Sequence, residues 1–356
     1  MKLPDFPWDA LAPYGDLARQ HRAGIIDLSQ GTPVDATPEL IQRALAEHSN
    51  SPSYPLTAGT AQLRDAIRQW AVNRLGATGD FDVLPLIGSK EFVAWLPTFL
   101  QAKRVLFPKV AYPTYKVGAI LADAEPIAVD LDAQQWPDVD LAWINSPSNP
   151  TGRVHTAEEF TDAIRYSHSR KTPVVSDECY LEFGDSIEPA SILAFTEADN
   201  TNILAVHSLS KRSSMAGYRG AFVIGDPVLI SRILEIRKHA GMMVPLPIQH
   251  SMIAALGDDM HVSQQRTRYI ARRKTLIPAL ESIGFRVDHS EAGLYIWCTR
   301  SEDSWKSVDA LAQLGILVTP GNFYGADGSQ HVRIALTATD AAIADAAARI
   351  TASKVQ

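Results

Sequence analysis

Hydrophobic positions along the chain form short apolar runs that alternate with longer stretches of helical spacing. The runs are rich in aliphatic and aromatic residues and are bounded by turn residues, so each predicts a buried strand. In the first two thirds these strands are 25–28, 83–87, 105–107, 127–129, 141–144, 174–175, 203–206 and 221–224. Apolar residues three and four apart predict helices at 38–47, 60–71, from 89, 156–170 and 227–243. The alternation from about residue 55 to 225 indicates an α/β fold, a mostly parallel sheet with helices on both faces.

The two ends of the chain predict a smaller α+β unit. Strands are expected at 285–287, 294–297, 316–318 and 332–336, and helices at 259–282, 308–314 and the Ala-rich C-terminus. Pro278 predicts a kink or break in the first of these helices. The first 24 residues are rich in Pro and aromatic residues and predict an arm lying on another surface, including that of a second subunit. We therefore expect an arm and part of the small domain at 1–45, a large domain at 46–245 and the rest of the small domain at 246–356.

Composition narrows the class of protein. The chain has 356 residues, of which 46% are hydrophobic and 21% charged, and its formal net charge is −7. These values are ordinary for a globular protein, and the negative charge argues against a nucleic-acid partner. The basic residues of 266–274 fit a solvated helix face better than a nucleic-acid patch. Two cysteines and scattered histidines predict neither disulfides nor a metal site, and no apolar run approaches ~18 residues, so a cytoplasmic protein is expected.

One lysine stands on the turn between the apolar runs 203–206 and 221–224. Lys211 has Ser208 three residues before it and Arg219 eight residues after it. A lysine at the edge of a buried sheet loses hydration, which lowers the pKa of its amine and makes the amine a nucleophile. Such an amine suits a Schiff base with a carbonyl cofactor, while Arg219 and Ser208 suit a phosphate. Because most lysines are merely solvated, the rest of the chain must supply the other parts of such a site.

Other predicted strands also end in polar or aromatic residues, at the edge where open α/β sheets bind ligands. Gly88 and Ser89 open a helix whose free N–H groups suit an anion, although taken alone they fit an ordinary helix cap better. Tyr112 follows another strand, where its ring could lie flat on a heteroaromatic ring. Asp177 ends a mostly apolar strand and is costly there unless it is paired. Cys179, close by, is expected to be a buried small hydrophobe.

These motifs together resemble those of the pyridoxal-phosphate aminotransferases of fold type I, the class I/II group. The resemblance covers nearly the whole chain and rests on Asn-Pro-Thr-Gly at 149–152, Asp-x-x-Tyr at 177–180, Ser-x-Ser-Lys at 208–211 with Arg219, and Val-Arg at 332–333. It implies a homodimeric enzyme with a seven-stranded sheet in its large domain and pyridoxal 5′-phosphate held by Lys211 as a Schiff base. Asp177 would then keep the pyridine nitrogen protonated, which makes the ring an electron sink.

The same resemblance implies roles for the other motif residues. Tyr180 and Asn149 would bind the ring 3-oxygen, Tyr112 would stack on the ring, and Tyr54 would cross a dimer interface to the partner's phosphate. The phosphate would be cradled by Gly88, Ser89, Lys90, Ser208 and Arg219. Arg333 would grip the substrate α-carboxylate, with Asn149 and the backbone of Gly31 beside it. Lys211, Asp177 and Tyr180 would be catalytic.

Several stretches are more closely similar to the actinobacterial N-succinyldiaminopimelate aminotransferases. They are 3–9, 88–97, 145–152, 207–211, 238–245, 292–295 and 331–339. This resemblance implies ping-pong exchange of an amino group between N-succinyl-LL-2,6-diaminopimelate and 2-oxoglutarate, in the route to diaminopimelate and lysine. Both substrates carry a second carboxylate, for which Lys90 is the candidate cation.

Three alternatives remain open at this point. Another amino-acid aminotransferase, or a carbon–sulfur β-lyase on the same scaffold, would share every cofactor residue. A ligand-sensing regulator with a winged-helix domain would need a basic N-terminal domain, whereas only about 24 residues precede the first predicted strand.

Overall fold

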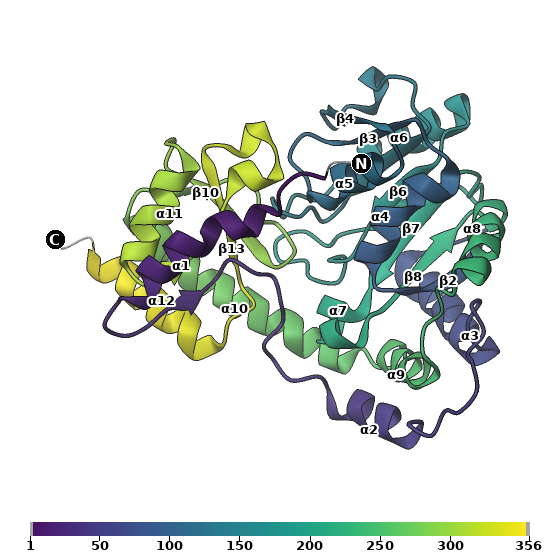
Figure 1. Ribbon diagram of the computed structural model, residues 1–356, viewed down its shortest axis with the longest axis horizontal. Coiled ribbons are helices and arrows are strands. Elements are labelled where there is room, and N and C mark those ends of the chain that lie inside the picture. The colour runs from purple at the N-terminus through teal and green to yellow at the C-terminus, as the bar shows by residue number, and fades with distance from the viewer. Residues whose placement is uncertain (1–2, 354–356) are drawn as a thin grey trace.

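A seven-stranded sheet forms the larger of two groups of elements that lie side by side in this computed structural model, which describes residues 3–353 (Figure 1). Its strands are β2 (Asp82–Ile87), β3 (Arg104–Pro108), β4 (Glu125–Val129), β5 (Leu141–Asn145), β6 (Val174–Asp177), β7 (Ile203–Ser208) and β8 (Gly220–Gly225). Their order is β2-β8-β7-β6-β5-β3-β4. β8 is antiparallel to both of its neighbours, and the pairs from β7 to β4 are parallel. The predicted mostly parallel sheet is therefore confirmed.

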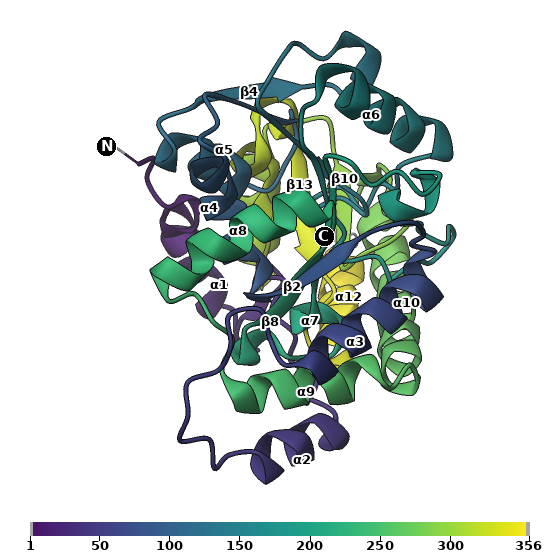
Figure 2. The ribbon, with the colours of Figure 1, turned by 90° about the vertical axis from the view of Figure 1, so that its right-hand side faces the viewer.

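Helices cover both faces of this sheet, because its strands are apolar on both sides. They are α3 (Ala61–Trp70), α4 (Ser89–Leu100), α5 (Thr114–Leu121), α6 (Ala157–Arg170), α8 (Pro227–Ala240) and α9 (Leu246–Leu256). One core cluster unites the sheet with α4, α5 and α8, and another unites it with α3, α6 and α9 (Figure 2). The short α7 (Leu209–Arg212) follows β7 directly, and α2 (Glu39–Glu47) packs on α9.

The second group combines the two ends of the chain around its own apolar core. Its helices are α1 (Ala12–Arg19), α10 (Met260–Ser282), α11 (Ser304–Gln313) and α12 (Asp340–Ser353). Its strands are β1 (Ile26–Asp27), β9 (Arg286–Val287), β10 (Tyr295–Thr299), β11 (Ile316–Leu317), β12 (Thr319–Pro320) and β13 (His331–Ala335). β1 pairs with β11, and the other four form an antiparallel sheet in the order β12-β13-β10-β9.

Short helical turns connect these elements. They are η1 (Pro7–Leu11), η2 (Ala71–Leu75), η3 (Ala133–Gln135), η4 (Ile192–Phe195), η5 (Ala216–Tyr218), η6 (Gly321–Tyr324) and η7 (Ala326–Gly328). α9 packs on α2 and α3, whereas α10 packs on α12, so the helices change partners between residues 256 and 260. The domain limits at 45 and 245 stay a prediction. Between residues 3 and 353, none of the helices combines the length and the apolar content that crossing a bilayer requires.

The local predictions miss some helices, for identifiable reasons. α5 was not predicted, since Pro113 ahead of it reads as a turn. α9 was not predicted either, because Pro245 and Pro247 read as breaks, although Pro247 lies in the first turn of the helix, where proline is tolerated. α10 runs unbroken through Pro278, so the expected break was wrong. Helix α2 begins at Glu39, one residue later than expected, and Pro38 is its N-cap residue.

Candidate active site

A cavity of about 570 Å³ draws its walls from both groups of elements, at the carboxyl ends of β5, β6 and β7. Most of the predicted site residues line it, although their motifs are spread along the whole chain. They are Gly31, Ser89, Lys90, Tyr112, Asn149, Asp177, Tyr180, Ser208, Lys211, Arg219 and Arg333. Gly88 lies next to this wall as the N-cap residue of α4. Tyr54 is the exception, since its side chain is 94% exposed and does not line the cavity.

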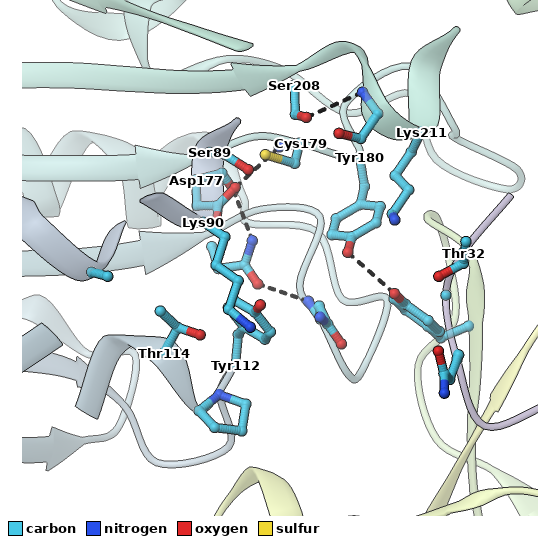
Figure 3. A pocket seen from close by; sticks show the side chains of 18 of the residues that line it. Thr32, Ser89, Lys90, Tyr112, Thr114, Asp177, Cys179, Tyr180, Ser208 and Lys211 are labelled. Carbon is cyan, nitrogen blue, oxygen red and sulfur yellow. Dashed lines mark hydrogen bonds between the residues drawn. The ribbon is translucent and has the colours of Figure 1, made fainter. Parts of the chain in front are cut away.

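Lys211 lies on α7, directly after β7. The Ser208 hydroxyl caps this helix by accepting a hydrogen bond from the Ser210 N–H at 3.2 Å. This bond stabilises the turn from which the Lys211 side chain points into the cavity. Figure 3 shows the Lys211 side chain extending beside Tyr180. Burial lowers the pKa of Lys211, and the charges of Arg333 and Arg219 act in the same direction. Its amine is therefore easier to deprotonate than an exposed lysine, as a nucleophile requires.

Asp177 occupies the last position of β6 and is buried. Its Oδ2 accepts the Tyr115 hydroxyl at 2.8 Å, and its Oδ1 accepts the Cys179 N–H at 3.3 Å. Burial raises the pKa of Asp177, while the hydrogen bonds from Cys179 and Tyr115 oppose that rise. These hydrogen bonds hold the carboxylate in place, and no cationic side chain between residues 3 and 353 forms a salt bridge with it. Tyr115 was missed at the sequence level, although a tyrosine one helical turn from Tyr112 and buried in the core must find a polar partner for its hydroxyl.

The first turn of α4 and Arg219 together form a cradle for an anion. Ser89 and Lys90 begin this helix, so their backbone N–H groups have no partner within it. Gly88 has φ 78°, and a Cβ there would lie 2.0 Å from a guanidinium nitrogen of Arg219. Only glycine therefore lets Arg219 approach the helix end so closely. The Arg219 guanidinium donates to the Ala216 carbonyl at 2.9 Å and otherwise adds its charge to the cradle.

Arg333, on β13, is 3% exposed and lies against the aromatic rings of Tyr295 and Tyr324, whose centroids are 4.1 and 5.0 Å from its guanidinium carbon. It donates to Asn149 Oδ1 at 2.9 Å and to the Ser29 carbonyl at 2.6 Å. Among residues 3–353, no carboxylate pairs with it, and its Nε has no partner. A buried guanidinium without a counter-ion is costly, so this end of the cavity suits a ligand carboxylate.

Gly31 lies against Tyr295 on the same side. A Cβ on Gly31 would lie 2.0 Å from the Tyr295 hydroxyl oxygen. The chain can therefore run this close to Tyr295 only because residue 31 is glycine. That hydroxyl lies 3.2 Å from the hydroxyl of Tyr180. Tyr295 was not among the predicted site residues. Its position in the predicted strand 294–297 did not indicate that its side chain would line the cavity.

The N-terminal segment also lines the cavity, through Phe6, Pro7 and Trp8. An arm lying on another surface was expected, and the segment runs from α1 across the small group toward α5 of its own chain (Figure 1). Contact of this arm with a second subunit stays a prediction. Trp8 packs against Phe323, with ring centroids 5.6 Å apart, and Phe6 lies 5.9 Å from the Lys90 amine. Cys179, expected in the core, is instead half-buried on the cavity wall.

These residues fit pyridoxal 5′-phosphate. The cradle at α4 suits its phosphate, the Lys211 amine suits its aldehyde, and Asp177 suits its ring nitrogen. Tyr112 lies on the same wall and offers a ring to stack on (Figure 3). Within the described residues, no cluster of three or more His, Cys, Asp or Glu side chains is placed to bind a metal ion.

Known proteins similar to this chain point the same way. The family model for aminotransferase class I and II matches residues 23–350. A probable aminotransferase of Mycobacterium tuberculosis is 52% identical over 357 residues, covering 98% of this chain and 85% of that protein. The 4-dedimethylamino-4-oxo-anhydrotetracycline transaminase OxyQ of Streptomyces rimosus is 50% identical over 358 residues, covering 98% of this chain and 99% of that protein.

Solved structures agree with the fold. A probable N-succinyldiaminopimelate aminotransferase from Thermus thermophilus has a TM-score of 0.89 at 26% identity and covers 98% of this chain and 100% of its own. An aminotransferase from Staphylococcus aureus also has a TM-score of 0.89 at 26% identity, covering 99% of this chain and 98% of its own. The fold type I prediction is thereby confirmed. This chain belongs to the aminotransferase class I and II family, and it is a pyridoxal 5′-phosphate-dependent aminotransferase.

Proposed function

We propose that this aminotransferase exchanges an amino group between N-succinyl-LL-2,6-diaminopimelate and 2-oxoglutarate, in the route to diaminopimelate and lysine. The observation that carries the proposal is a pair of cations at different depths of one cavity. Arg333 is buried and lacks a counter-ion within the described part of the chain, so it suits the α-carboxylate. Lys90 is exposed at the cavity wall and pairs with no carboxylate among residues 3–353, so it suits a carboxylate at the far end of a long substrate.

The surroundings of Lys90 support this assignment. Its amine lies 5.9 Å from the ring centroid of Phe6 and 6.0 Å from that of Tyr112. Aromatic faces stabilise a cation only weakly, by about 0.5–1 kcal/mol at exposed sites, so the amine stays available to a carboxylate. A succinyl group would extend along these rings toward Lys90.

Each side chain would then have one task. The cofactor, when bound, supplies a carbonyl for the substrate amine and a ring that accepts electron density. Lys211, as the neutral amine favoured by its environment, would move the proton from the substrate α-carbon, with Asp177 holding a proton on the ring nitrogen. Tyr180 and Asn149 would orient the ring through its 3-oxygen, and Tyr112 would stack on it. Kinetics should be ping-pong, since one site serves both half-reactions.

The phosphate would be held by the cradle described above, with Ser208 completing it. In a homodimer, Tyr54 of the partner subunit would add a further hydroxyl to this phosphate. The high exposure of Tyr54 supports that role. Tyr54 is 94% exposed, so its aromatic ring is not buried by its own chain and is accessible to a second subunit.

A second candidate substrate is a polycyclic ketone. The relative from Streptomyces rimosus, which is 50% identical over nearly its whole length, is named for such a reaction. The cavity rim formed by Phe6, Trp8 and Tyr112 would suit a flat ring system as well as a succinyl arm.

The test is a panel of amino donors with 2-oxoglutarate, with glutamate formation as the readout. The panel includes N-succinyl-diaminopimelate, free diaminopimelate, an aromatic amino acid and, in reverse, a polycyclic ketone with glutamate. We expect the succinylated donor to give the highest kcat/KM. Preference for the ketone would support the second candidate. A cysteine conjugate is assayed alongside the panel, and release of pyruvate and a thiol from it would instead indicate a lyase.

Lys90 is tested with the same panel. Lys90→Met should raise KM for the succinylated donor roughly 10-fold and leave an aromatic donor unchanged, since one charge-assisted hydrogen bond contributes about 1.5 kcal/mol or more. Lys103→Met, which removes an exposed lysine beyond the C-terminus of α4 and off the cavity wall, is the matched control. Equal Michaelis constants for Lys90→Met and the parent enzyme would remove Lys90 from the substrate site.

A further inference from the structure

A second cavity, of about 350 Å³, lies behind the loop that carries Asn149. Asn145, at the end of β5, lines both this cavity and the one that contains Lys211. Its Oδ1 accepts a hydrogen bond from the Asn149 N–H at 2.7 Å, which ties the loop to the end of the strand. Ser148 and Thr151 line the second cavity, whereas Asn149 between them lines the first. One loop therefore forms a wall of both cavities.

The charged side chains of the second cavity come from both groups of elements. Lys109 and Asp130, which follow β3 and β4, satisfy each other through a hydrogen bond of 2.7 Å. Arg153 donates from Nη2 to Glu159 at 2.5 Å, whereas its Nη1 is buried and has no hydrogen-bond partner among the described residues. Asp327, on η7 of the small group, is exposed and forms no salt bridge within residues 3–353. One guanidinium nitrogen and one carboxylate are therefore left for a ligand.

A buried histidine on the same wall also lacks a partner. His155 is 7% exposed and lines the cavity, yet neither of its ring nitrogens has a hydrogen-bond partner in the described part of the chain. Its ring packs against Phe160 with centroids 5.4 Å apart, and its backbone N–H donates to Ser146 Oγ at 2.9 Å. Burial lowers the pKa of His155, so the neutral imidazole offers one donor and one acceptor at pH 7. Because unpaired buried polar groups are costly, a molecule that bonds to His155 and to Arg153 Nη1 is favoured here.

We propose that the second cavity binds a zwitterionic α-amino acid, with its carboxylate on Arg153, its ammonium group on Asp327 and a polar atom on His155. A zwitterion is favoured because a ligand with a single charge would engage only one of the two free charged groups. Such a ligand bridges the two groups of elements, since Arg153 lies between β5 and α6 and Asp327 lies on η7. It also contacts the loop that carries Asn149. The site is distinct from the cofactor cavity and does not depend on which substrate the enzyme uses.

The test is isothermal titration of holoenzyme whose lysine–cofactor linkage has been reduced with borohydride, so that no turnover occurs. The probes are L-alanine, L-lysine and L-glutamate, together with propionate and propylamine, which each carry only one of the two charges. Arg333→Met removes the cation proposed for the substrate carboxylate and so confines amino-acid binding to the second cavity. We expect Arg333→Met to retain binding of at least one of the amino acids, and to bind propionate and propylamine at least tenfold more weakly.

Substitutions in the second cavity complete the test. Adding Arg153→Met or Asp327→Asn to Arg333→Met should weaken the remaining binding at least tenfold. Because Asp327 is exposed, Asp327→Asn tests the site whether or not Arg153→Met folds. Arg165→Met is the matched control, since Arg165 also pairs with a carboxylate, that of Asp162, but lies off the cavity wall.

Several results would overturn the proposal. They are an absence of amino-acid binding to Arg333→Met, equally tight binding of propionate or propylamine, an affinity that Asp327→Asn or Arg153→Met leaves unchanged, and an equal loss in Arg165→Met. If Arg333→Met instead bound as many amino acids per chain as the parent, the proposed role of Arg333 in the active site would fail.

Discussion

Replacing Tyr115 by phenylalanine removes a single hydroxyl from the hydrogen bond that holds Asp177. The Tyr115 ring is fully buried and stacks on Trp143, with centroids 5.3 Å apart, so phenylalanine keeps the packing. What is lost is the 2.8 Å bond from the hydroxyl to Asp177 Oδ2. The carboxylate then retains the Cys179 N–H as a donor, at the longer distance of 3.3 Å.

The size of the effect follows from the charge on the acceptor. A hydrogen bond to an ionised group contributes about 1.5–3 kcal/mol, and the lost donor raises the pKa of Asp177 further. If Asp177 holds the cofactor ring nitrogen as proposed, a less readily ionised carboxyl would bind it more weakly. We therefore expect Tyr115→Phe to weaken pyridoxal 5′-phosphate binding roughly 10- to 150-fold, which is that energy expressed as a ratio of dissociation constants.

The assay is titration of the cofactor-free protein with pyridoxal 5′-phosphate, followed by quenching of tryptophan fluorescence. Tyr166→Phe is the matched control, because the Tyr166 hydroxyl also donates a hydrogen bond, to the partly buried Pro137 carbonyl at 2.6 Å, but lies off the cavity wall. The control should lose stability in urea and keep its cofactor affinity. A Tyr115→Phe protein that binds the cofactor within twofold of the parent would refute the reasoning.

Three further predictions concern the cavity and the pH dependence of stability. Gly31→Ala should raise KM for every α-amino acid about tenfold with cofactor binding unchanged, because its Cβ would displace Tyr295; unchanged Michaelis constants would contradict this. Lys211→Met should melt at a higher temperature than the cofactor-free parent at pH 7, and this difference in melting temperature should narrow toward pH 10. The reason is that the folded-state pKa of Lys211 lies below 10.5, so the parent gains stability as pH rises. A difference that did not change with pH would count against this. Burial lowers the pKa of His155 to about 4, so the folded protein should lose up to about 3 kcal/mol of unfolding free energy as pH falls from 6.5 toward that value. In His155→Leu, the unfolding free energies measured in urea at pH 7 and pH 5 should differ less than they do in the parent.

Much of the fold was predictable because its strands are buried on both faces. Such strands appear as continuous apolar runs, and all seven strands of the large sheet were predicted to within a few residues. The prolines around α5 and α9 concealed those helices, since the same residue marks either a turn or the start of a helix. α10 continues through Pro278 and packs against α12, a contact between distant segments that no local pattern records.

The sequence by itself determined which side chains could do chemistry and on which strand ends they stand. Lys211, Asp177 and Arg219 could be named because their charge is out of place beside apolar runs, and the motifs around them have fixed spacing. Their convergence on one cavity is a property of the tertiary structure. Arg333 meets Asn149 across 184 residues of chain, and a contact of that separation leaves no periodic trace in either segment.

Only the tertiary structure decided what surrounds these groups. The Tyr115 hydroxyl on Asp177, the second cavity behind the Asn149 loop and the Phe6–Trp8 rim arise because elements distant in the chain pack against one another. Burial and neighbouring charges, which set the pKa of a side chain, are properties of that packing. The chain therefore encodes the reactive groups locally, whereas their protonation and orientation are set by contacts that form only on folding.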